Sequence, residues 1–226
     1  MSPIIEPKRA YTKPRVNVQD RNRIRKSGIV YNIPKGKFYG RYISEDQIRI
    51  LEELTKKGLP VEELFLISKA NPRRGTKFTI SLDHGVSLYD SIIKNRDNPK
   101  LILKYLDDVK NIVATMHNNG ISFGHAHFNN FVVDSTGKVR IIDFKEASRT
   151  LHYLEPSTVL DSFYLDYLNM DGSLCQLGFT NAGFRLNFFN DIISKYNMPD
   201  GLKKEFLDLV RKDVLRASKL RIKLGF

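Results

Sequence analysis

The stretch that most constrains the fold of this chain is GISFGHAHFNNFVVDSTGKVRIIDFKEA, residues 120–147. Ahead of it, apolar residues within 102–116 recur at steps of four, three, four and three, which predicts a long amphipathic helix. Within the stretch, segments 131–134 and 139–143 predict two apolar strands joined by a tight turn. This order of helix, loop and hairpin places a polar loop beside a carboxylate, Asp143, that ends an apolar strand.

Shorter elements are expected on the amino-terminal side. Residues 28–43 alternate aromatic and β-branched residues with turn formers, which indicates short strands. Ser44 has the character of a helix N-cap, and the helix after it is expected to end at Gly58. Residues 64–68 and 77–82 predict two further strands joined by a turn.

Helices account for most of the remaining chain. Ser87 is a candidate cap of a short helix, and Asn98 followed by proline is a cap sequence that begins the long one. Gly120 is expected to end that long helix. Beyond residue 147 the pattern is mostly helical, with breaks expected near 171–172 and 199–201.

Composition limits the class of protein. Hydrophobic residues make up 41% of the 226, so a sizeable core can be buried. No apolar run approaches the ~18 residues that a membrane span requires, and the N-terminus lacks the apolar stretch of a signal peptide. Cys175 is the only cysteine, which excludes an internal disulfide. We therefore expect a soluble intracellular protein without a membrane span.

The net charge of +12 lies at the two ends of the chain. Residues 1–44 hold 11 Lys and Arg against two acidic residues, and residues 202–226 hold eight against three. Such basic segments commonly meet phosphates, which makes RNA or DNA a candidate partner. The alternative is a solvated surface that keeps the protein soluble. The candidate nucleic-acid contacts are Arg21, Arg23, Arg25 and Lys26.

Asn130 and Asp143 are candidate metal ligands. Mg²⁺ prefers hard oxygen ligands and takes one or two from protein, with phosphate and water supplying the rest. An amide on a loop and a carboxylate at a strand end suit that requirement beside the phosphates of a nucleotide. The alternative roles are a loop-stabilising amide for Asn130 and a strand-end cap for Asp143.

The same stretch resembles the protein kinase superfamily, particularly small atypical members such as the RIO kinases, the kinase of the KEOPS complex and the aminoglycoside phosphotransferases. FGHAHFNN occupies the place of their catalytic loop, which resembles HGDLHxxN. The family's catalytic Asp lies five residues before its metal-binding Asn. This spacing aligns His125 with that Asp, and His127 with the second His of the loop. Asp143 begins DFK, which resembles the metal-binding DFG with Lys145 in place of Gly.

The resemblance covers residues 44–168. FTISLDHGVSLYDSIIK resembles the strand, hinge and helix that cradle adenine, which implies that Ser81 and Asp83 contact the nucleotide. QIRILEEL resembles the helix that supplies a Glu to the ATP-positioning Lys, with Gln47 at the Glu position. Asp161 resembles the Asp of a later helix that braces the catalytic loop.

Several departures from the family pattern bear on activity. His125 replaces the carboxylate that orients the acceptor hydroxyl, and is either a substitute base or non-catalytic. Gln47 cannot form an ion pair with a lysine. Lys145 either mimics the charge of a metal or phosphate, or points to solvent. No GxGxxG precedes the first helix, so the phosphates lose their usual backbone cover. Lys37 or Arg41 is the candidate nucleotide-binding cation.

The resemblance implies an α+β, two-lobed protein kinase-like fold. Residues 1–28 would form a basic arm, 29–83 a small β-rich N-lobe, and 84–226 a mainly helical C-lobe with a basic C-terminal helix. The implied cofactors are ATP and Mg²⁺. The first functional hypothesis is a pseudokinase that acts as a scaffold or regulator of a protein partner. The second is an active atypical ATP-dependent Ser/Thr kinase or small phosphotransferase, and the third is a nucleic-acid-associated module.

Overall fold

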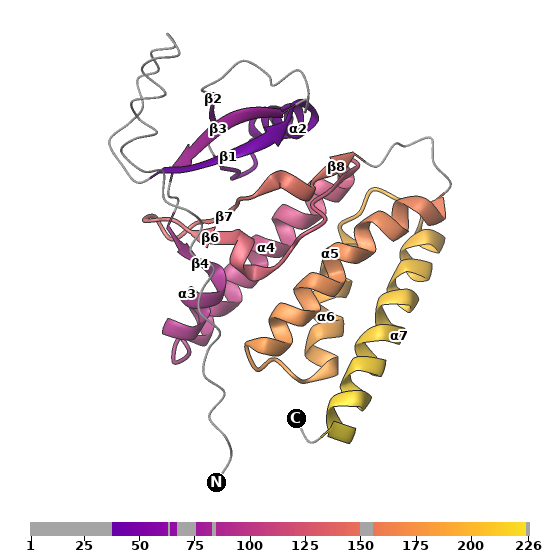
Figure 1. Cartoon of the computed structure of the whole chain (residues 1–226). Coiled ribbons are helices and arrows are strands. Elements are labelled where there is room, and N and C mark those ends of the chain that lie inside the picture. Colours follow the sequence, from indigo (N-terminus) through magenta and orange to yellow (C-terminus); the bar gives the residue numbers. More distant parts are fainter. Residues whose placement is uncertain (1–37, 63, 67–75, 83–84, 150–155, 225–226) are drawn as a thin grey trace. The chain divides into compact units, whose positions relative to one another are not determined.

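A computed structural model describes residues 38–62, 64–66, 76–82, 85–149 and 156–224 (Figure 1). The described residues fall into two compact units. One contains three strands, and the other contains residues 45–62 together with the chain from Gly85 onward. Helices dominate the second unit, and every paired sheet in the described ranges is antiparallel. The prediction of an α+β protein is therefore confirmed.

The first unit is a three-stranded antiparallel sheet. Its strands are β1 (Phe38–Ser44), β2 (Leu64–Leu66) and β3 (Thr76–Leu82), in the order β1-β3-β2. β1 and β3 pair along their whole length, from Phe38 opposite Leu82 to Ser44 opposite Thr76. The strand predicted at 77–82 is confirmed, and 64–66 of the strand predicted at 64–68 is confirmed. Residues 67–68, and residues 28–37 of the predicted first strand region, lie outside the described residues.

The second unit begins with α2 (Glu45–Lys56), the helix that the cap sequence at Ser44 predicts. Two acidic residues, Glu45 and Asp46, occupy its first turn, where their negative charges interact favourably with the positive end of the helix dipole. The helix ends just before Gly58, whose φ of 76° requires a residue without a Cβ penalty. Its apolar face is buried through Ile48, Ile50, Leu51 and Leu54.

Two capped helices follow, α3 (Leu88–Lys94) and α4 (Pro99–Asn118). The side chain of Ser87 accepts the Asp90 N–H at 3.0 Å, and that of Asn98 accepts the Leu101 N–H at 3.1 Å. These contacts satisfy backbone donors that a helix leaves unpaired at its start. Gly120 follows the end of α4 with a φ of 64°. The predicted apolar face of α4 is buried: Ile102, Leu106, Val109, Val113 and Met116.

Short strands surround the loop that follows α4. β6 (Phe131–Val133) and β7 (Val139–Ile141) form the predicted hairpin, with Phe131 opposite Ile141. β4 (Val86–Ser87) adds to β6, giving the order β4-β6-β7. β5 (Ile121–Ser122) pairs with β8 (Ser148–Arg149). Both ends of the 123–130 loop are therefore attached to strands.

Three helices complete the second unit: α5 (Pro156–Gln176), α6 (Ala182–Ser194) and α7 (Asp200–Leu224). The predicted break near 199–201 is present, because α7 starts at Asp200. The predicted break near 171–172 is wrong, because α5 continues to Gln176. A glycine inside a helix costs only about 1 kcal/mol relative to alanine, and burial of Met170 and Leu174 on either side of Gly172 offsets that cost.

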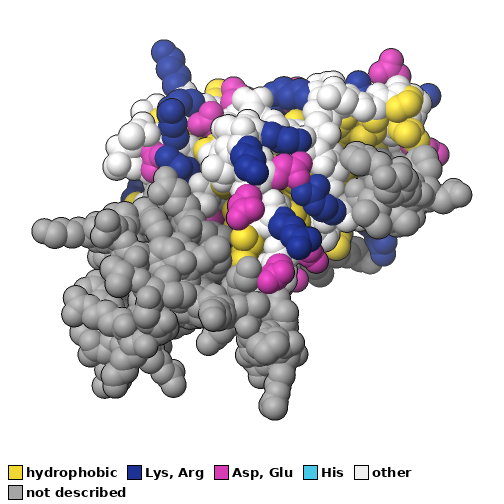
Figure 2. Space-filling model, turned by 90° about the horizontal axis from the view of Figure 1, so that it is seen from above, with side chains coloured by type: hydrophobic (Ala, Val, Ile, Leu, Met, Phe, Trp, Pro, Cys, Tyr) yellow, Lys and Arg dark blue, Asp and Glu magenta, His cyan; other side chains and the backbone are white. Residues whose placement is uncertain are grey.

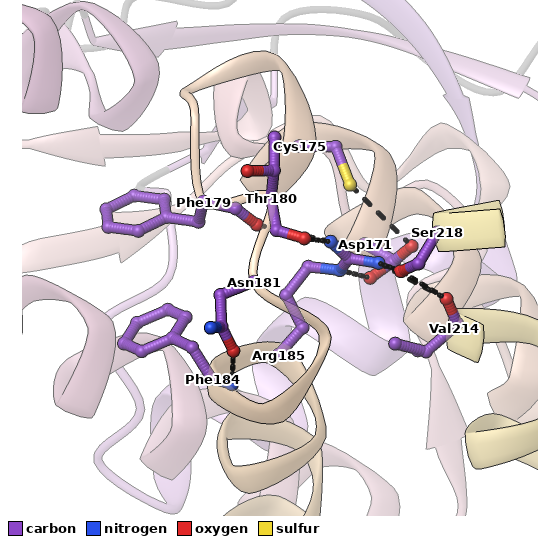
Figure 3. Close-up of polar contacts among 9 residues, drawn as sticks. All are labelled: Asp171, Cys175, Phe179, Thr180, Asn181, Phe184, Arg185, Val214 and Ser218. Atoms are coloured by element: carbon purple, nitrogen blue, oxygen red, sulfur yellow. Dashed lines mark hydrogen bonds and ion pairs between the residues drawn. The ribbon is translucent and has the colours of Figure 1, made fainter. Parts of the chain in front are cut away.

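A buried arginine connects these three helices (Figure 3). Arg185 of α6 is fully buried, and its Nε donates to Asp171 Oδ1 of α5 at 2.6 Å. One terminal nitrogen of the guanidinium donates to the Thr180 carbonyl at 2.7 Å, and the other donates to Ser218 Oγ of α7 at 2.8 Å. Longer contacts of 3.3 Å reach the carbonyls of Phe179 and Val214. The five N–H donors of the side chain thus have protein acceptors, which is the condition for burying such a charge.

Removing this guanidinium should destabilise the fold strongly. In Arg185→Met, the partly buried Asp171 carboxylate loses its counter-charge and several carbonyls lose their donor. We expect the free energy of unfolding to fall by about 3–5 kcal/mol, measured by urea denaturation. The control is Arg211→Met on α7, which removes an exposed arginine whose pairing with Asp208 is as long as 4.0 Å and should leave stability nearly unchanged. Similar losses in both variants would contradict the role assigned to Arg185.

Candidate functional site

The 123–130 loop is anchored at its start by a buried carboxylate. Asp166 of α5 is fully buried, and its Oδ2 accepts the Phe123 backbone N–H at 2.8 Å. The same oxygen accepts from Ser122 Oγ at 3.3 Å and lies 3.0 Å from His117 Nε2 of α4. His117 is also stacked against Phe163 at 3.9 Å between ring centroids. One carboxylate oxygen therefore ties α4, α5 and the loop together.

This anchor was expected at Asp161, and that expectation was wrong. Asp161 is exposed, whereas Asp166 lies beside the buried face of α5. Phe163, Tyr167 and Met170 define that face at helical spacing. Asp166 lies three residues after Phe163, one before Tyr167 and four before Met170. The helical spacing of the apolar residues in DSFYLDYLNM was therefore the signal that could have distinguished Asp166 from Asp161.

Asn130 closes the loop from its other end. Its side-chain Nδ2 donates to the His125 carbonyl at 2.9 Å, and its backbone N–H donates to the His127 carbonyl at 2.8 Å. The loop-stabilising role considered for this amide is therefore present. Because Nδ2 is held by the loop, the amide oxygen Oδ1 is directed away from that carbonyl. No hydrogen bond occupies Oδ1 within the described part of the chain, so Oδ1 is a suitable metal ligand.

Asp143 has an unusual backbone conformation. Its φ of 70° and ψ of 58° are left-handed, and among the described residues no other non-glycine has a positive φ. This conformation is uncommon outside glycine, and strained backbone of this kind clusters at functional sites. Asp143 is 8% exposed and precedes the 3-10 turn η2 (Phe144–Glu146) without a side-chain capping bond. The carboxylate therefore does not cap this 3-10 turn, and the strand-end role considered from the sequence stays a prediction.

The structure brings the backbones of the two candidate ligands together. The Ile142 N–H donates to the Asn130 carbonyl at 2.8 Å, so the residue before Asp143 is hydrogen-bonded to Asn130 itself. The Asp143 N–H donates to Glu62 Oε1 at 2.7 Å. Glu62 is only 3% exposed and was missed from the sequence, because nothing in LPVEELFL separates it from the neighbouring Glu63.

The two loop histidines lie in contact beside Asn130. The ring centroids of His125 and His127 are 4.7 Å apart at an angle of 77°. Nδ1 of His125 is buried without a hydrogen-bond partner in the described ranges. Partial burial lowers the pKa of His127 below its ordinary value, and the neighbouring His125 lowers it further. The loop therefore disfavours a positive charge on His127.

Gln47 and Lys145 are connected to each other. The Gln47 side chain on α2 donates from Nε2 to the Lys145 carbonyl oxygen. The side chain of Lys145 is exposed, which favours the solvent-facing alternative for this residue. Gln47 thus contacts the backbone two residues after Asp143. The sequence resemblance to protein kinases does not suggest this role.

Two other candidate nucleotide contacts belong to the first unit. Arg41 and Ser81 belong to β1 and β3 of the first unit, where Arg41 is paired with Thr79 across the sheet. Lys37 and Asp83 lie outside the described residues. So do the candidate nucleic-acid contacts Arg21, Arg23, Arg25 and Lys26, and that proposal stays a prediction.

Charged side chains of both signs lie on the face that Figure 2 shows. Figure 2 shows Lys and Arg side chains interspersed with Asp and Glu side chains on the face in view.

A cavity of about 370 Å³ lies between α5 and α7, lined by Tyr164, Leu168, Val210 and Ala217 among others. No residue of the 123–130 loop lines it. Among the described helices, none is long and apolar enough to cross a membrane.

The candidate metal ligands at the loop are two oxygen donors, the side chains of Asn130 and Asp143. No cluster of three or more His, Cys, Asp or Glu side chains suited to a metal lies within the described ranges. Asn130 and Asp143 could supply an amide oxygen and a carboxylate oxygen, which are ligand types that Mg²⁺ accepts. Compared with models of known families and with curated proteins, the sequence matches none.

The Asp166 anchor can be tested with a matched pair of substitutions on one helix. Asp166→Ala leaves the Phe123 N–H and the His117 ring without their acceptor, so the free energy of unfolding should fall by at least about 2 kcal/mol. Asp161→Ala removes an exposed carboxylate from the same helix and should have little effect. Urea denaturation at neutral pH measures both. An equal effect of the two substitutions would show that Asp166 does not hold the loop.

The histidine pair predicts a pH dependence of stability. Because the pKa of His127 is lowered in the folded state, the unfolded chain binds more protons at this residue as the pH falls through about 6.5. His127 should therefore make no unfavourable contribution above that pH and should weaken the fold progressively below it. The variant His127→Gln should lose less stability than the wild type between about pH 7 and pH 5, measured by thermal denaturation. Parallel curves would contradict the shift.

Proposed function

We propose that this chain is a kinase-fold protein with a degenerate active site, a pseudokinase that binds ATP with Mg²⁺ and acts as a scaffold or regulator. The observation that carries the proposal is the arrangement of Asn130 and Asp143. Their backbones are joined through Ile142, the Asn130 amide is oriented by His125, and Asp143 is held in a left-handed conformation. Two preset oxygen ligands at one place are what a nucleotide-bound Mg²⁺ requires of a protein.

The order of elements supports a two-lobed kinase-like fold. A strand and α2 precede two further strands, and then come the long helix α4, a polar loop, a hairpin ending in Asp143, and three helices. The sequence resemblance covers residues 44–168 of this order. The fold by itself does not define an activity, so the functional part of the proposal depends on the site residues.

The same residues argue against efficient phosphoryl transfer. His125 occupies the position of the acceptor-orienting carboxylate but has no negative charge to offer beside a metal. Its Nδ1 has no described partner that would fix its tautomer. Gln47 donates to a carbonyl and has no charge with which to position a lysine. Transfer depends on such preorganised contacts, and losing one can cost on the order of 10²-fold in rate.

An active atypical phosphotransferase is the runner-up. It is favoured by one observation, the lowered pKa of His127, because a neutral imidazole in this loop can accept a proton. The two candidates differ in a single measurable quantity, which is the rate of phosphate transfer when MgATP is bound.

The binding part of the proposal predicts metal-dependent stabilisation by ATP. At a ligand concentration of about 100 times the dissociation constant, binding adds roughly 2.7 kcal/mol, which corresponds to an increase in Tm of about 5–10 °C for a chain of this size. Asp143→Ala should abolish the part of the shift that requires Mg²⁺. The control Asp161→Ala, which removes an exposed carboxylate outside the site, should retain it. A thermal-denaturation series with ATP, with and without Mg²⁺, measures this.

The transfer assay separates the candidates. With radiolabelled ATP, the wild type is expected to show at most slow transfer to itself or to a generic acceptor. Robust transfer that disappears in both Asp143→Ala and His125→Ala would establish the phosphotransferase instead. If ATP with Mg²⁺ produced no stabilisation of the wild type, nucleotide binding would be wrong and only the fold would remain of the proposal.

A further inference from the structure

Residues 45–62 hold the segment that follows β7 through several contacts. The bridge between Val61 and Ile141 is parallel, the Ile141 N–H donates to the Pro60 carbonyl at 2.9 Å, and the Glu62 N–H donates to the Ile141 carbonyl at 3.0 Å. Further along, Gln47 contacts the Lys145 carbonyl and Glu53 forms an ion pair with Arg149. These contacts all lie within the second unit. Residues 45–62 therefore form a clamp on residues 141–149.

Within this clamp, one contact reaches a candidate ligand directly. Glu62 Oε1 accepts the backbone N–H of Asp143 at 2.7 Å, and the Glu62 side chain is almost fully buried. Burying a carboxylate is costly unless hydrogen bonds compensate for the lost water. Glutamate is therefore an unusual choice for a position whose only task is to fill space.

The backbone conformation of Asp143 explains the role of the Glu62 carboxylate. A left-handed Asp persists only where the surroundings hold it, and the residues around Asp143 are held on both sides. Ahead of it, the Ile142 N–H is bonded to Asn130. At Asp143 itself the N–H is bonded to Glu62, and two residues later the carbonyl of Lys145 is bonded to Gln47. A backbone held in this way limits the directions that the Asp143 side chain can take.

We propose that Glu62 is a positioning residue for the metal site, which sets the left-handed conformation of Asp143 and so aims its carboxylate beside Asn130. The inference rests on the proposed function in one respect, namely that Asp143 is a metal ligand. It adds that the ligand is preset by residues 45–62 before nucleotide binds. Partners that orient a ligand in this way typically contribute 10–100-fold to metal affinity.

A direct electrostatic effect is the competing explanation, since a buried carboxylate near Asp143 would also attract a cation. Two substitutions separate the explanations. Glu62→Gln removes the charge but keeps a carbonyl oxygen that can accept the Asp143 N–H. Glu62→Leu removes both the charge and the acceptor. If position matters, the glutamine variant resembles the wild type. If charge matters, the two variants are equally impaired.

The experiment uses the full-length chain and two measurements on each protein. Hydrogen exchange of the Asp143 amide, followed by NMR without any ligand, reports whether the hydrogen bond is kept. Calorimetric titration with ATP in the presence and absence of Mg²⁺ reports the metal-dependent affinity. We expect strong protection of the Asp143 amide in the wild type. For Glu62→Gln we expect the same protection and the same Mg²⁺-dependent affinity as the wild type. For Glu62→Leu we expect loss of protection and about a 10–100-fold loss of the Mg²⁺-dependent affinity, with ATP binding in the absence of metal unchanged.

The inference is overturned if affinity and protection do not vary together. Two results would show this. In the first, Glu62→Leu loses protection of the Asp143 amide yet binds MgATP normally. In the second, Glu62→Gln keeps that protection yet binds MgATP as weakly as Glu62→Leu. A wild type that binds no MgATP would instead refute the proposed function, and the exchange data would then show separately whether Glu62 orders Asp143. An unprotected Asp143 amide in the wild type would also end the inference, because the hydrogen bond would not exist in solution.

Discussion

The buried carboxylate of Asp166 is the group on which the architecture around the loop depends. A carboxylate removed from water must recover its lost hydrogen bonds from the protein. The Oδ2 atom of Asp166 does so with donors from two places, the backbone and hydroxyl at the end of β5 and the ring of His117 on α4, while Oδ1 has no hydrogen-bond partner among the described residues. Because these donors come from separate elements, satisfying this one oxygen fixes where α4 ends, where α5 passes and where the 123–130 loop starts.

From that anchor, a series of hydrogen bonds leads to Asp143. The His125 carbonyl accepts from the Asn130 side chain, the Asn130 carbonyl accepts from Ile142, and the next amide along the chain donates to the Glu62 side chain. The first contact lies within the loop, and the other two join segments that are distant in sequence. The backbone at Asp143 is therefore held by residues from several parts of the second unit.

Local chemistry made several elements predictable. Asn98 and Pro99 gave the start of α4, Gly120 its end, and the turn after Asp134 the hairpin, because caps, prolines and tight turns act over a few residues. The candidate ligands Asn130 and Asp143 could also be selected, since their spacing and neighbours are local features. The kinase-like arrangement of two lobes stays a prediction.

Tertiary partners could not be predicted in the same way. Asp161 and Asp166 are both aspartates on α5, and only the buried face of the folded helix distinguishes them. Glu62 and Glu63 are adjacent and chemically identical, and the choice between them depends on β7 passing nearby. The helix break expected at Gly172 failed for a related reason, because packing of Met170 and Leu174 outweighs the low helix propensity of glycine. In each case the deciding energy comes from residues remote in sequence.

The backbone and the side chain of His125 differ in what they contribute to the loop. At position 125 the hydrogen bonds from Asn130 and His127 are accepted by the backbone carbonyl, and the side chain contributes none that is described. A different side chain at position 125 would therefore leave these hydrogen bonds of the loop in place. Asn130 and Asp143, by contrast, take part in the hydrogen bonds that connect the loop to the end of the hairpin and to Glu62. The fold thus constrains the two candidate ligands more tightly than it constrains the His125 side chain.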